Sequence, residues 1–198
     1  MGNDNLIVNG DFESGDSNFT TDYFPGQGTC NHGAGFLGCE GAYNVIDDPG
    51  LGHNNFASCS DNGSGGNMMV VNGAGSLQQI WCQNVCVDPD GSYVFNAFAA
   101  SVNPSSPARL QFAIDGTLIG NLFGLTNATC IWEFFEAEWD ADGETTVEIC
   151  VTNQNTAAGG NDFALDDIGF FEVCKDEMSF DVFVNEFEIE TFNPEDID

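Results

Sequence analysis

Two short segments near opposite ends of this chain constrain its fold most, because each combines an apolar strand pattern with acidic side chains. The first is residues 5–13 and the second is residues 160–170. If the two strands lie side by side in one sheet, four carboxylates come close together: Asp11, Glu13, Asp166 and Asp167. Packed carboxylates repel one another unless a hard, oxygen-seeking cation such as Ca²⁺ neutralises them. The sequence therefore predicts a calcium site; the alternative is that these are ordinary turn and edge carboxylates.

Between these ends the chain reads as a series of short strands. No long stretch keeps the apolar spacing of a helix, whereas apolar runs and alternating patterns recur between Gly, Asn and Asp turns. Asp115-Gly116 has the composition of a tight hairpin turn. The expected strands include residues 6–9, 67–72, 93–100, 110–114, 132–139 and 147–151. Such a pattern predicts an all-β protein, a β-sandwich.

Residues 26–66 differ from the rest because they are rich in Gly, Asn and Ser and have too few apolar residues for regular strands. We expect long loops in this region that disulfides hold together. Loops on a rigid sandwich are common places for binding surfaces.

Eight cysteines in one domain predict disulfides and an oxidising compartment. A cross-strand bond is expected between Cys130 and Cys150. The remaining expected pairs are Cys82–Cys86, Cys30–Cys39 and, by elimination, Cys59–Cys174. A zinc site is the alternative, but no second close cysteine pair follows Cys82 and Cys86, and His32 and His53 are not spaced as ligands.

The charge excludes several classes of partner. The chain has 32 acidic residues against two basic ones, Arg109 and Lys175, and a formal net charge of −30. Nucleic acid and anionic lipid need basic patches that this chain lacks. No apolar span is long enough to cross a membrane, and polar residues rather than a signal peptide follow Met1. We therefore expect a module of a larger secreted protein, located outside the cell or on its surface.

The sequence gives no sign of catalysis. A glycosidase needs a defined pair of carboxylates, but acidic residues are so abundant here that any two would fit by chance. The two histidines lie in loops, where they are expected to form hydrogen bonds, and oxidised cysteines cannot act as nucleophiles. We predict that the chain is not an enzyme.

Aromatic residues are candidates for a sugar-stacking platform, although most aromatic side chains of a sandwich belong to its core. Tyr23 and Tyr43 are the better candidates because they lie in the loop-rich half, and packing is expected for Trp81, Trp132 and Trp139. Polar partners for a sugar in that half are Asn54, Asn55, Asp61 and Asn67.

The last segment is predicted to be a separate extension, with residues 1–175 forming the sandwich module and residues 176–198 the extension. It contains nine acidic residues and no basic one, yet its apolar residues alternate, as in Phe180, Val182 and Val184. We expect a strand that pairs with the domain's own sheet edge, or with that of a neighbouring protomer or module.

Residues 5–174 resemble a module that is repeated in very large secreted and surface proteins of Bacteroidetes-type bacteria. It belongs with the galactose-binding-like jelly rolls that include many carbohydrate-binding modules. The segments that carry the resemblance are residues 5–13, 64–73, 80–81, 107–112 and 151–167. The resemblance implies a jelly-roll sandwich, and it maps the calcium ligands to Asp11, Glu13 and Asp167, with Asp166 beside them. The eight cysteines exceed what the family pattern requires.

Taken together, the sequence predicts a non-catalytic, calcium-stabilised module that binds glycan or another surface ligand within a large adhesin. The first alternative is a repeating unit of a surface filament that assembles through the extension. A glycoside hydrolase is a distant third possibility.

Overall fold

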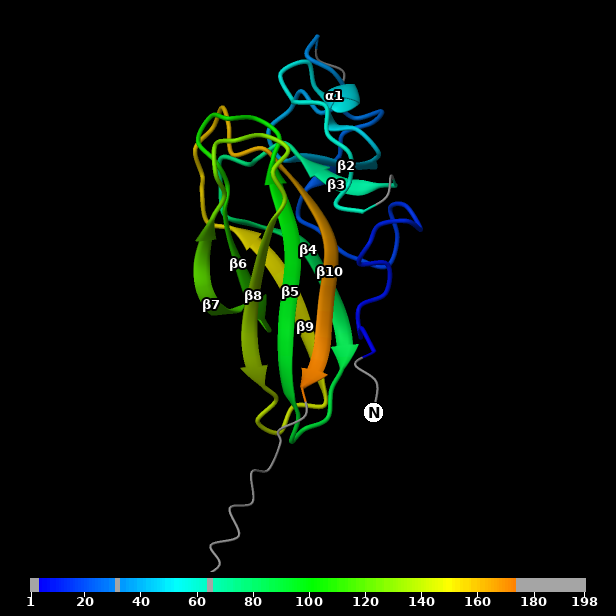
Figure 1. The fold of residues 1–198 in the computed structure, drawn as a ribbon, viewed down its shortest axis with the longest axis vertical. Helices are drawn as coiled ribbons and strands as arrows, with labels where there is room; N and C mark the ends of the chain where they lie inside the picture. Colours follow the sequence, from blue (N-terminus) through cyan, green and yellow to red (C-terminus); the bar gives the residue numbers. More distant parts are fainter. Residues whose placement is uncertain (1–3, 31–32, 64–65, 174–198) are drawn as a thin grey trace, which may run out of the picture.

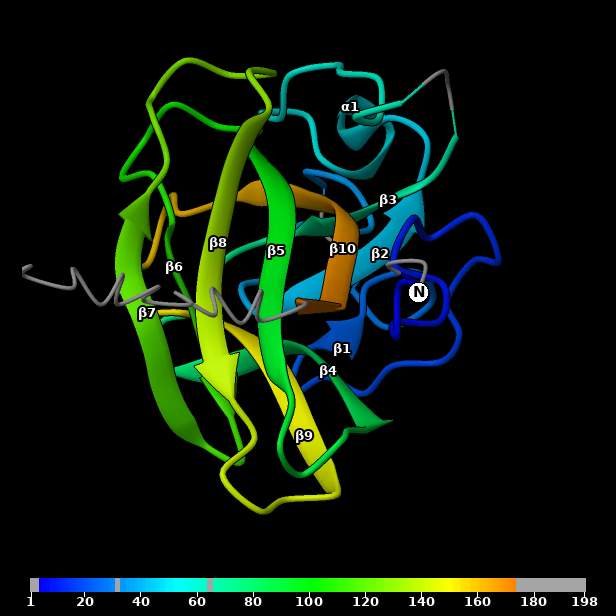
Figure 2. The same cartoon turned by 60° about the horizontal axis from the view of Figure 1, so that its bottom comes forward.

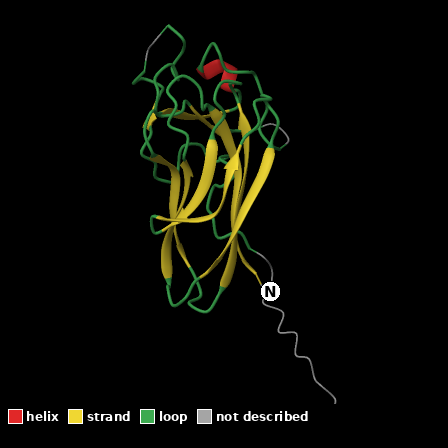
Figure 3. Ribbon diagram, turned by 90° about the vertical axis from the view of Figure 1, so that its left-hand side faces the viewer, coloured by secondary structure: helices red, strands yellow, loops and turns green. Residues whose placement is uncertain are grey.

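Two β-sheets pack face to face in the computed structural model, which describes residues 4–30, 33–63 and 66–173 (Figure 1). The six-stranded sheet has the order β1-β2-β3-β10-β5-β8 and the four-stranded sheet has the order β4-β9-β6-β7. The predicted all-β jelly-roll sandwich is confirmed (Figure 3). The strands are β1 (Phe24–Pro25), β2 (Ala42–Ile46), β3 (Met68–Val71), β4 (Gln78–Cys86), β5 (Ser92–Ser101), β6 (Arg109–Ile114), β7 (Thr117–Gly124), β8 (Glu133–Asp140), β9 (Thr146–Asn153) and β10 (Phe163–Val173).

Aromatic rings fill the space between the two sheets. Phe95 of β5 stacks on Phe112 of β6 with ring centroids 3.9 Å apart, and Phe112 stacks on Phe135 of β8 at 4.6 Å. These residues are buried because alternate positions of each strand face the core. Burying each such ring stabilises the fold by about 1.5–3 kcal/mol. The packing joins the sheets across the sandwich, so the outer faces remain available for other contacts.

The predicted hairpin at Asp115-Gly116 is confirmed. Ile114 pairs with Thr117, which leaves a two-residue turn between β6 and β7. Both turn residues have positive φ values, 47° at Asp115 and 75° at Gly116, as a type I′ turn requires.

The described residues between 26 and 66, namely 26–30, 33–63 and 66, form a layer of loops, here called the loop layer, at one end of the sandwich (Figure 1). The prediction that this region has no regular strand is wrong, because it contains β2 and the short helix α1 (Pro49–Gly52). β2 pairs with β3 in antiparallel register. The strand therefore forms because β3 supplies a pairing partner, which the composition of this region does not reveal. The layer has its own small core, in which Leu37 and Phe56 pack against Val70 and Ala164 of the sheet.

Three disulfides join described residues, and one of them was predicted. Cys30–Cys39 lies within the loop layer and confirms that prediction. The other predicted pairs are wrong, because Cys59 bonds to Cys130 and Cys82 bonds to Cys150. Cys82 and Cys150 are direct partners on β4 and β9, whereas Cys86 is exposed and unpaired in the described chain. Cys174 lies outside the described residues.

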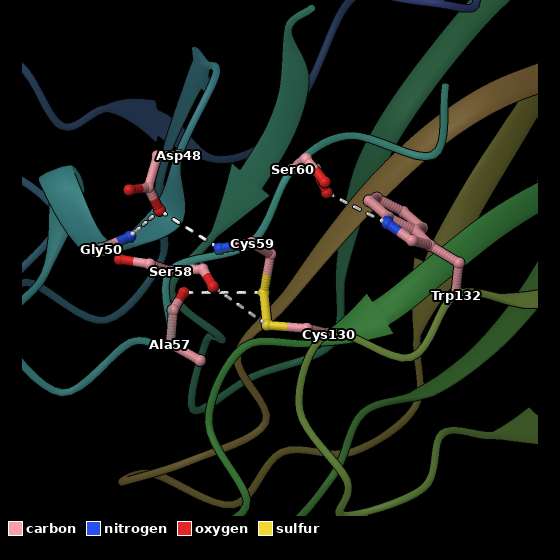
Figure 4. Close-up of a disulfide and its surroundings, with 8 residues drawn as sticks. All are labelled: Asp48, Gly50, Ala57, Ser58, Cys59, Ser60, Cys130 and Trp132. Atoms are coloured by element: carbon pink, nitrogen blue, oxygen red, sulfur yellow. Dashed lines mark hydrogen bonds between the residues drawn. A yellow bond between two sulfur atoms is a disulfide. The ribbon is translucent and has the colours of Figure 1, made fainter. Parts of the chain in front are cut away.

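The Cys59–Cys130 bond attaches the loop layer to the connection between β7 and β8 (Figure 4). Close to it, the indole N–H of Trp132 donates to the carbonyl of Ser60 at 3.2 Å. Asp48 caps α1 by accepting from the Gly50 N–H at 2.9 Å and also accepts from the Cys59 N–H at 3.3 Å. The layer is therefore tied to the sandwich at several points.

None of the described helices could cross a membrane. The predicted extension, residues 176–198, lies outside the described residues.

Candidate functional site

The N-terminal segment lies beside β10, as the sequence predicted, but it is not a strand. The Leu6 N–H donates to the carbonyl of Phe170 and the Ile168 N–H donates to the carbonyl of Gly10, both at 2.9 Å. Asn5 also accepts from the Phe170 N–H at 3.0 Å with its side-chain oxygen. A side chain at Gly10 would place its Cβ 2.1 Å from the Ile168 carbonyl oxygen, so this close approach needs glycine. The prediction of a strand at residues 6–9 is wrong, because side-chain hydrogen bonds of Asn5 replace part of the backbone hydrogen-bond ladder to β10.

A bulge in β10 sets the directions of its two neighbouring acidic side chains. The register with β5 shifts between Asp166 and Gly169, and Asp167 has a φ of 48°. Such a bulge re-aims side chains that would otherwise alternate strictly between the two faces. Asp166 is only 2% exposed, whereas Asp167 is exposed.

Asp166 is held by the loop layer as well as by its own strand. One carboxylate oxygen accepts from the Asn62 N–H at 3.0 Å and the other from the Asp167 N–H at 2.8 Å. The pKa of Asp166 is raised to about 7, mainly by burial and to a smaller extent by the nearby carboxylates of Asp167 and Asp61, while the two hydrogen bonds lower it. The Asn62 side chain donates to Asp167 at 2.7 Å.

Glu13 and Asp11 approach the same bulge from the N-terminal segment. Glu13 accepts from the Asn67 N–H at 2.8 Å, just before β3 begins beside β10. Asp11 and Asp167 line one cavity of about 340 Å³. The four predicted metal ligands therefore gather around the β10 bulge, together with Asp61. These five side chains are here called the carboxylate cluster: Asp11, Glu13, Asp61, Asp166 and Asp167.

The carboxylate cluster suits calcium, since its five side chains offer carboxylate oxygens. The chain has two basic residues to offset this charge; Arg109 lies on β6 of the other sheet and Lys175 is outside the described residues. Among described residues, however, no three of these carboxylates lie within 4.8 Å of one another. A bound cation would therefore need carbonyl oxygens or a small closure of the cluster to complete its shell.

A different group does lie within that distance, namely Cys82, Glu148 and Cys150. It is not a metal site, because the two sulfur atoms are joined in a disulfide. Ala113 packs against this disulfide on the outer face of the four-stranded sheet.

The prediction that Tyr23 and Tyr43 form a sugar-stacking platform is wrong, because their side chains are buried. Tyr23 is 5% exposed and Tyr43 is 6% exposed. The Tyr23 hydroxyl accepts from the Ala74 N–H at 3.2 Å, and the Tyr43 hydroxyl donates to Asp16 at 3.0 Å. Burial raises the pKa of each tyrosine to about 12. Both rings support the core rather than a ligand.

The four polar residues expected beside those tyrosines divide into two groups. Asn54 and Asn55 are exposed in the loop layer, where the Asn54 side chain donates to the carbonyl of Gly33 at 3.1 Å. Asp61 and Asn67 instead adjoin the carboxylate cluster. The structure therefore brings two of them together with the predicted metal ligands and separates the other two.

Sequence reasoning missed a shallow groove on the outer face of the four-stranded sheet. Its volume is about 210 Å³. Its lining residues are Asp22, Leu77, Gln78, Gln79, Ala113, Gly116, Leu118, Thr152 and Gln154. The sequence signal that could have revealed the groove is the alternation along β9, where Thr152 faces outward between the buried Val151 and Asn153.

The polar groups of this groove are side-chain amides, a hydroxyl and the carboxylate of Asp22. Thr152 donates to the carbonyl of Gln111 at 2.9 Å and accepts from the Gln154 amide at 2.9 Å. Leu118 is 47% exposed and supplies an apolar wall. Such a surface offers donors, acceptors and apolar contact to an uncharged polar ligand.

The bulky aromatic and histidine side chains behave as the sequence predicted. Trp81 is fully buried in the core, and Trp132 and Trp139 are partly buried and pack against the two cores. His53 accepts from the Asn55 N–H at 3.1 Å, as a loop hydrogen-bonding residue would. His32 lies outside the described residues.

No family model and no curated protein matches this chain. Solved structures do match it over most of its length. The CBM22-1 xylan-binding domain of Xyn10C from Paenibacillus barcinonensis is 14% identical, with 87% of this chain and 96% of that domain covered and a TM-score of 0.57. TmCBM61, solved in complex with β-1,4-galactotriose, is 15% identical, with coverage of 86% and 99% and a TM-score of 0.55.

The same fold also occurs in an enzyme. The Stig cyclase Fisc from Fischerella sp. TAU is 12% identical, with 85% of this chain and 96% of the cyclase covered and a TM-score of 0.56. At such low identity these likenesses establish the jelly-roll fold, which carbohydrate-binding modules and this cyclase share.

Proposed function

We propose that this chain is a non-catalytic, extracellular glycan-binding module and that sugar binds in the groove on the four-stranded sheet. One observation carries the proposal: a sandwich that carbohydrate-binding modules match over most of its length has an open groove lined by Gln79, Thr152 and Gln154. Amides and hydroxyls can exchange hydrogen bonds with sugar hydroxyls, and Leu118 can contact the apolar face of a sugar ring.

The lining of the groove supports a binding role over hydrolysis. A glycosidase needs two carboxyl groups on either side of the bond that it cleaves. Asp22 is the one carboxylate among the residues that line the groove, and it already accepts from the Gln79 N–H at 2.8 Å. The three disulfides support a location in an oxidising compartment outside the cell.

Calcium at the carboxylate cluster is the second part of the proposal. Its support is the gathering of carboxylates around the β10 bulge, where burial and, less strongly, the neighbouring carboxylates raise the pKa of Asp166. Asp11, Glu13, Asp166 and Asp167 are the side chains we propose as ligands. When bound, the cation would join the N-terminal segment to β10. An adhesin as the parent protein fits this role.

Affinity electrophoresis in gels that contain xylan or β-1,4-galactan tests the glycan proposal. We expect the wild-type chain to be retarded by at least one neutral polysaccharide. The double variant Gln79→Ala/Gln154→Ala should migrate as it does in a gel without polysaccharide, because both changes remove amides that line the groove.

A matched control separates the groove from the loop layer. Asn54→Ala/Asn55→Ala also removes two exposed amides, but on the surface that the sequence had favoured. This variant should keep full retardation. If it loses retardation while the groove variant keeps it, the sugar binds at the loop layer. If a broad glycan array shows no binding by the wild-type chain, the glycan function itself is wrong.

A further inference from the structure

A band of apolar side chains lies exposed on the outer face of the six-stranded sheet, beyond the part that the loop layer covers. Its members alternate with core residues on the three adjacent strands β8, β5 and β10 (Figure 2). They are here called the apolar band: Val94, Phe98, Phe134, Phe171 and Val173. Phe134 is 46% exposed and the others are half-buried. Aromatic side chains grouped on an outer sheet face mark an interaction surface.

The rings of the apolar band are fixed by contacts with one another and with the sheet. Phe98 and Phe134 are direct cross-strand partners, and their ring centroids lie 5.2 Å apart. The Phe171 ring lies over Gly169, because a Cβ at Gly169 would come within 2.3 Å of it. The glycine thus makes room for a ring that lies across the sheet. A surface that is already ordered loses little conformational entropy when a partner binds.

Negative charge borders the apolar band on β8. Glu136 and Glu138 are exposed and stand beside Asn96 and Val94 of the neighbouring strand. Glu138 also lines a cavity of about 600 Å³ that reaches Val173 at the end of the band. Arg109, the only basic residue of the described ranges, lies on the four-stranded sheet. The charge around the band is therefore of one sign.

From this arrangement we infer that the apolar band is a docking surface for a basic amphipathic peptide segment of another protein. Apolar side chains of the segment would cover Phe98, Phe134 and Phe171, and its Lys or Arg side chains would pair with Glu136 and Glu138. A cation over the exposed Phe134 ring adds a further attraction. A second copy of this chain fits poorly, because it would bring the same acidic border. So does this chain's own extension, residues 176–198, with nine acidic residues and no basic one.

A synthetic peptide of alternating lysine and leucine is the probe, and fluorescence anisotropy measures its binding to the full chain. Any protein of this charge attracts a cationic peptide, so the deciding variant leaves the charge unchanged. Phe134→Ser should weaken binding about tenfold, as for a central contact of an interface. Glu136→Gln/Glu138→Gln should also weaken it and should reduce its dependence on salt.

Two control variants make the same chemical changes elsewhere. Leu122→Ser removes a 39% exposed apolar side chain from β7, outside the groove, and Glu144→Gln removes an exposed charge from the β8–β9 connection. Both should leave the affinity unchanged, and hydrogen exchange should show peptide-induced protection in β8. Equal affinity for the Phe134→Ser variant and the wild-type chain would overturn the proposal. So would equal binding of an alternating glutamate and leucine peptide, or protection of β8 by a neutral oligosaccharide instead.

Discussion

The two outer faces of the sandwich are built in different ways. Over one end of the six-stranded sheet lie the loop layer with its own small core, a disulfide and the carboxylate cluster. Among the described residues, no loop layer covers the outer face of the four-stranded sheet, here called the bare face, which carries a disulfide between two neighbouring strands and a shallow groove. The difference indicates that the stability of the covered face depends on cross-links and charge, whereas the stability of the bare face depends on the pairing of the strands themselves.

The largest effect is expected from the disulfide that attaches the loop layer. Cys59→Ala/Cys130→Ala should lower the free energy of unfolding by roughly 4 kcal/mol, because the bond closes a loop with a sequence separation of 71. Thermal unfolding measures the loss, and hydrogen exchange should show that protection falls first in the loop layer. Cys82→Ala/Cys150→Ala, with a similar separation of 68, is the matched control on the bare face. If both variants lose protection in the same segments, the two faces are not independent.

The second largest effect on stability is expected from calcium, which would bind only on the covered face. A cation present at a hundred times its dissociation constant stabilises the fold by about 2.7 kcal/mol. Chelation should therefore lower the melting temperature, and Asp167→Ala should remove most of that change. Glu144→Gln removes a carboxylate outside the cluster and should leave the response to chelator intact. A melting temperature that is the same with and without chelator would show that the cluster is not a calcium site.

A third prediction concerns Asp162, just before β10. It is 4% exposed, and its pKa is raised to about 6, mainly by burial and also by the loop-layer Glu40, against the lowering effect of its hydrogen bonds to Gly73 and Asn103. Between about pH 4 and pH 6 the folded state therefore binds more protons than the unfolded state, so stability falls as pH rises through this window. Within this window, a change of one pH unit alters the free energy of unfolding by at most about 1.4 kcal/mol.

Asp162→Asn should flatten that pH dependence, since it keeps an acceptor for the Gly73 N–H, now bonded at 3.0 Å. Denaturant unfolding at a series of pH values measures the slope. The same change at the exposed Asp142 is the control and should leave the slope unaltered. An unchanged slope in the Asp162→Asn variant would assign the dependence to other groups.

The smallest effect is expected on the bare face. Gly116→Ala should destabilise the chain by about 1–2 kcal/mol, because its φ of 75° is unfavourable for a residue with a side chain. No atom lies within 4 Å of the added Cβ, so the loss would come from the backbone alone. Gly124→Ala, at the far end of β7, is equally unobstructed and has no positive φ. Similar losses at both positions would contradict this explanation.

Periodicity predicted the sandwich, because segments such as those of β6 and β9 alternate between apolar and polar or small residues. It could not predict β2, whose few apolar residues become a strand only because β3 offers a partner. The carboxylates were predicted to meet because they flank the two segments that adjoin along β10. Which of Asp166 and Asp167 is buried depends on a bulge that no pattern revealed.

The cysteine pairs show the same limit. Cys30–Cys39 was predictable from short separation, whereas Cys59–Cys130 depends on where the loop layer lies on the sandwich. The tyrosines were assigned to a ligand because they lie in a loop-rich segment, but burial is decided by packing in three dimensions. The groove was missed because its lining residues come from distant parts of the chain, among them Asp22, Gln79 and Gln154.

The position of β10 has a consequence for the order in which the molecule can be completed. The last strand of the described residues, β10, lies inside the six-stranded sheet, between β3 and β5, and also contacts the N-terminal segment. A ribosome makes the N-terminus first, so the strands on either side of β10, namely β1 to β3 and β5 with β8, cannot join into one sheet until β10 has been made. Pairings between such distant residues form slowly. We therefore expect a newly made chain to stay incompletely folded until residues 163–173 have emerged, which would keep it extended enough to be threaded through a narrow export channel.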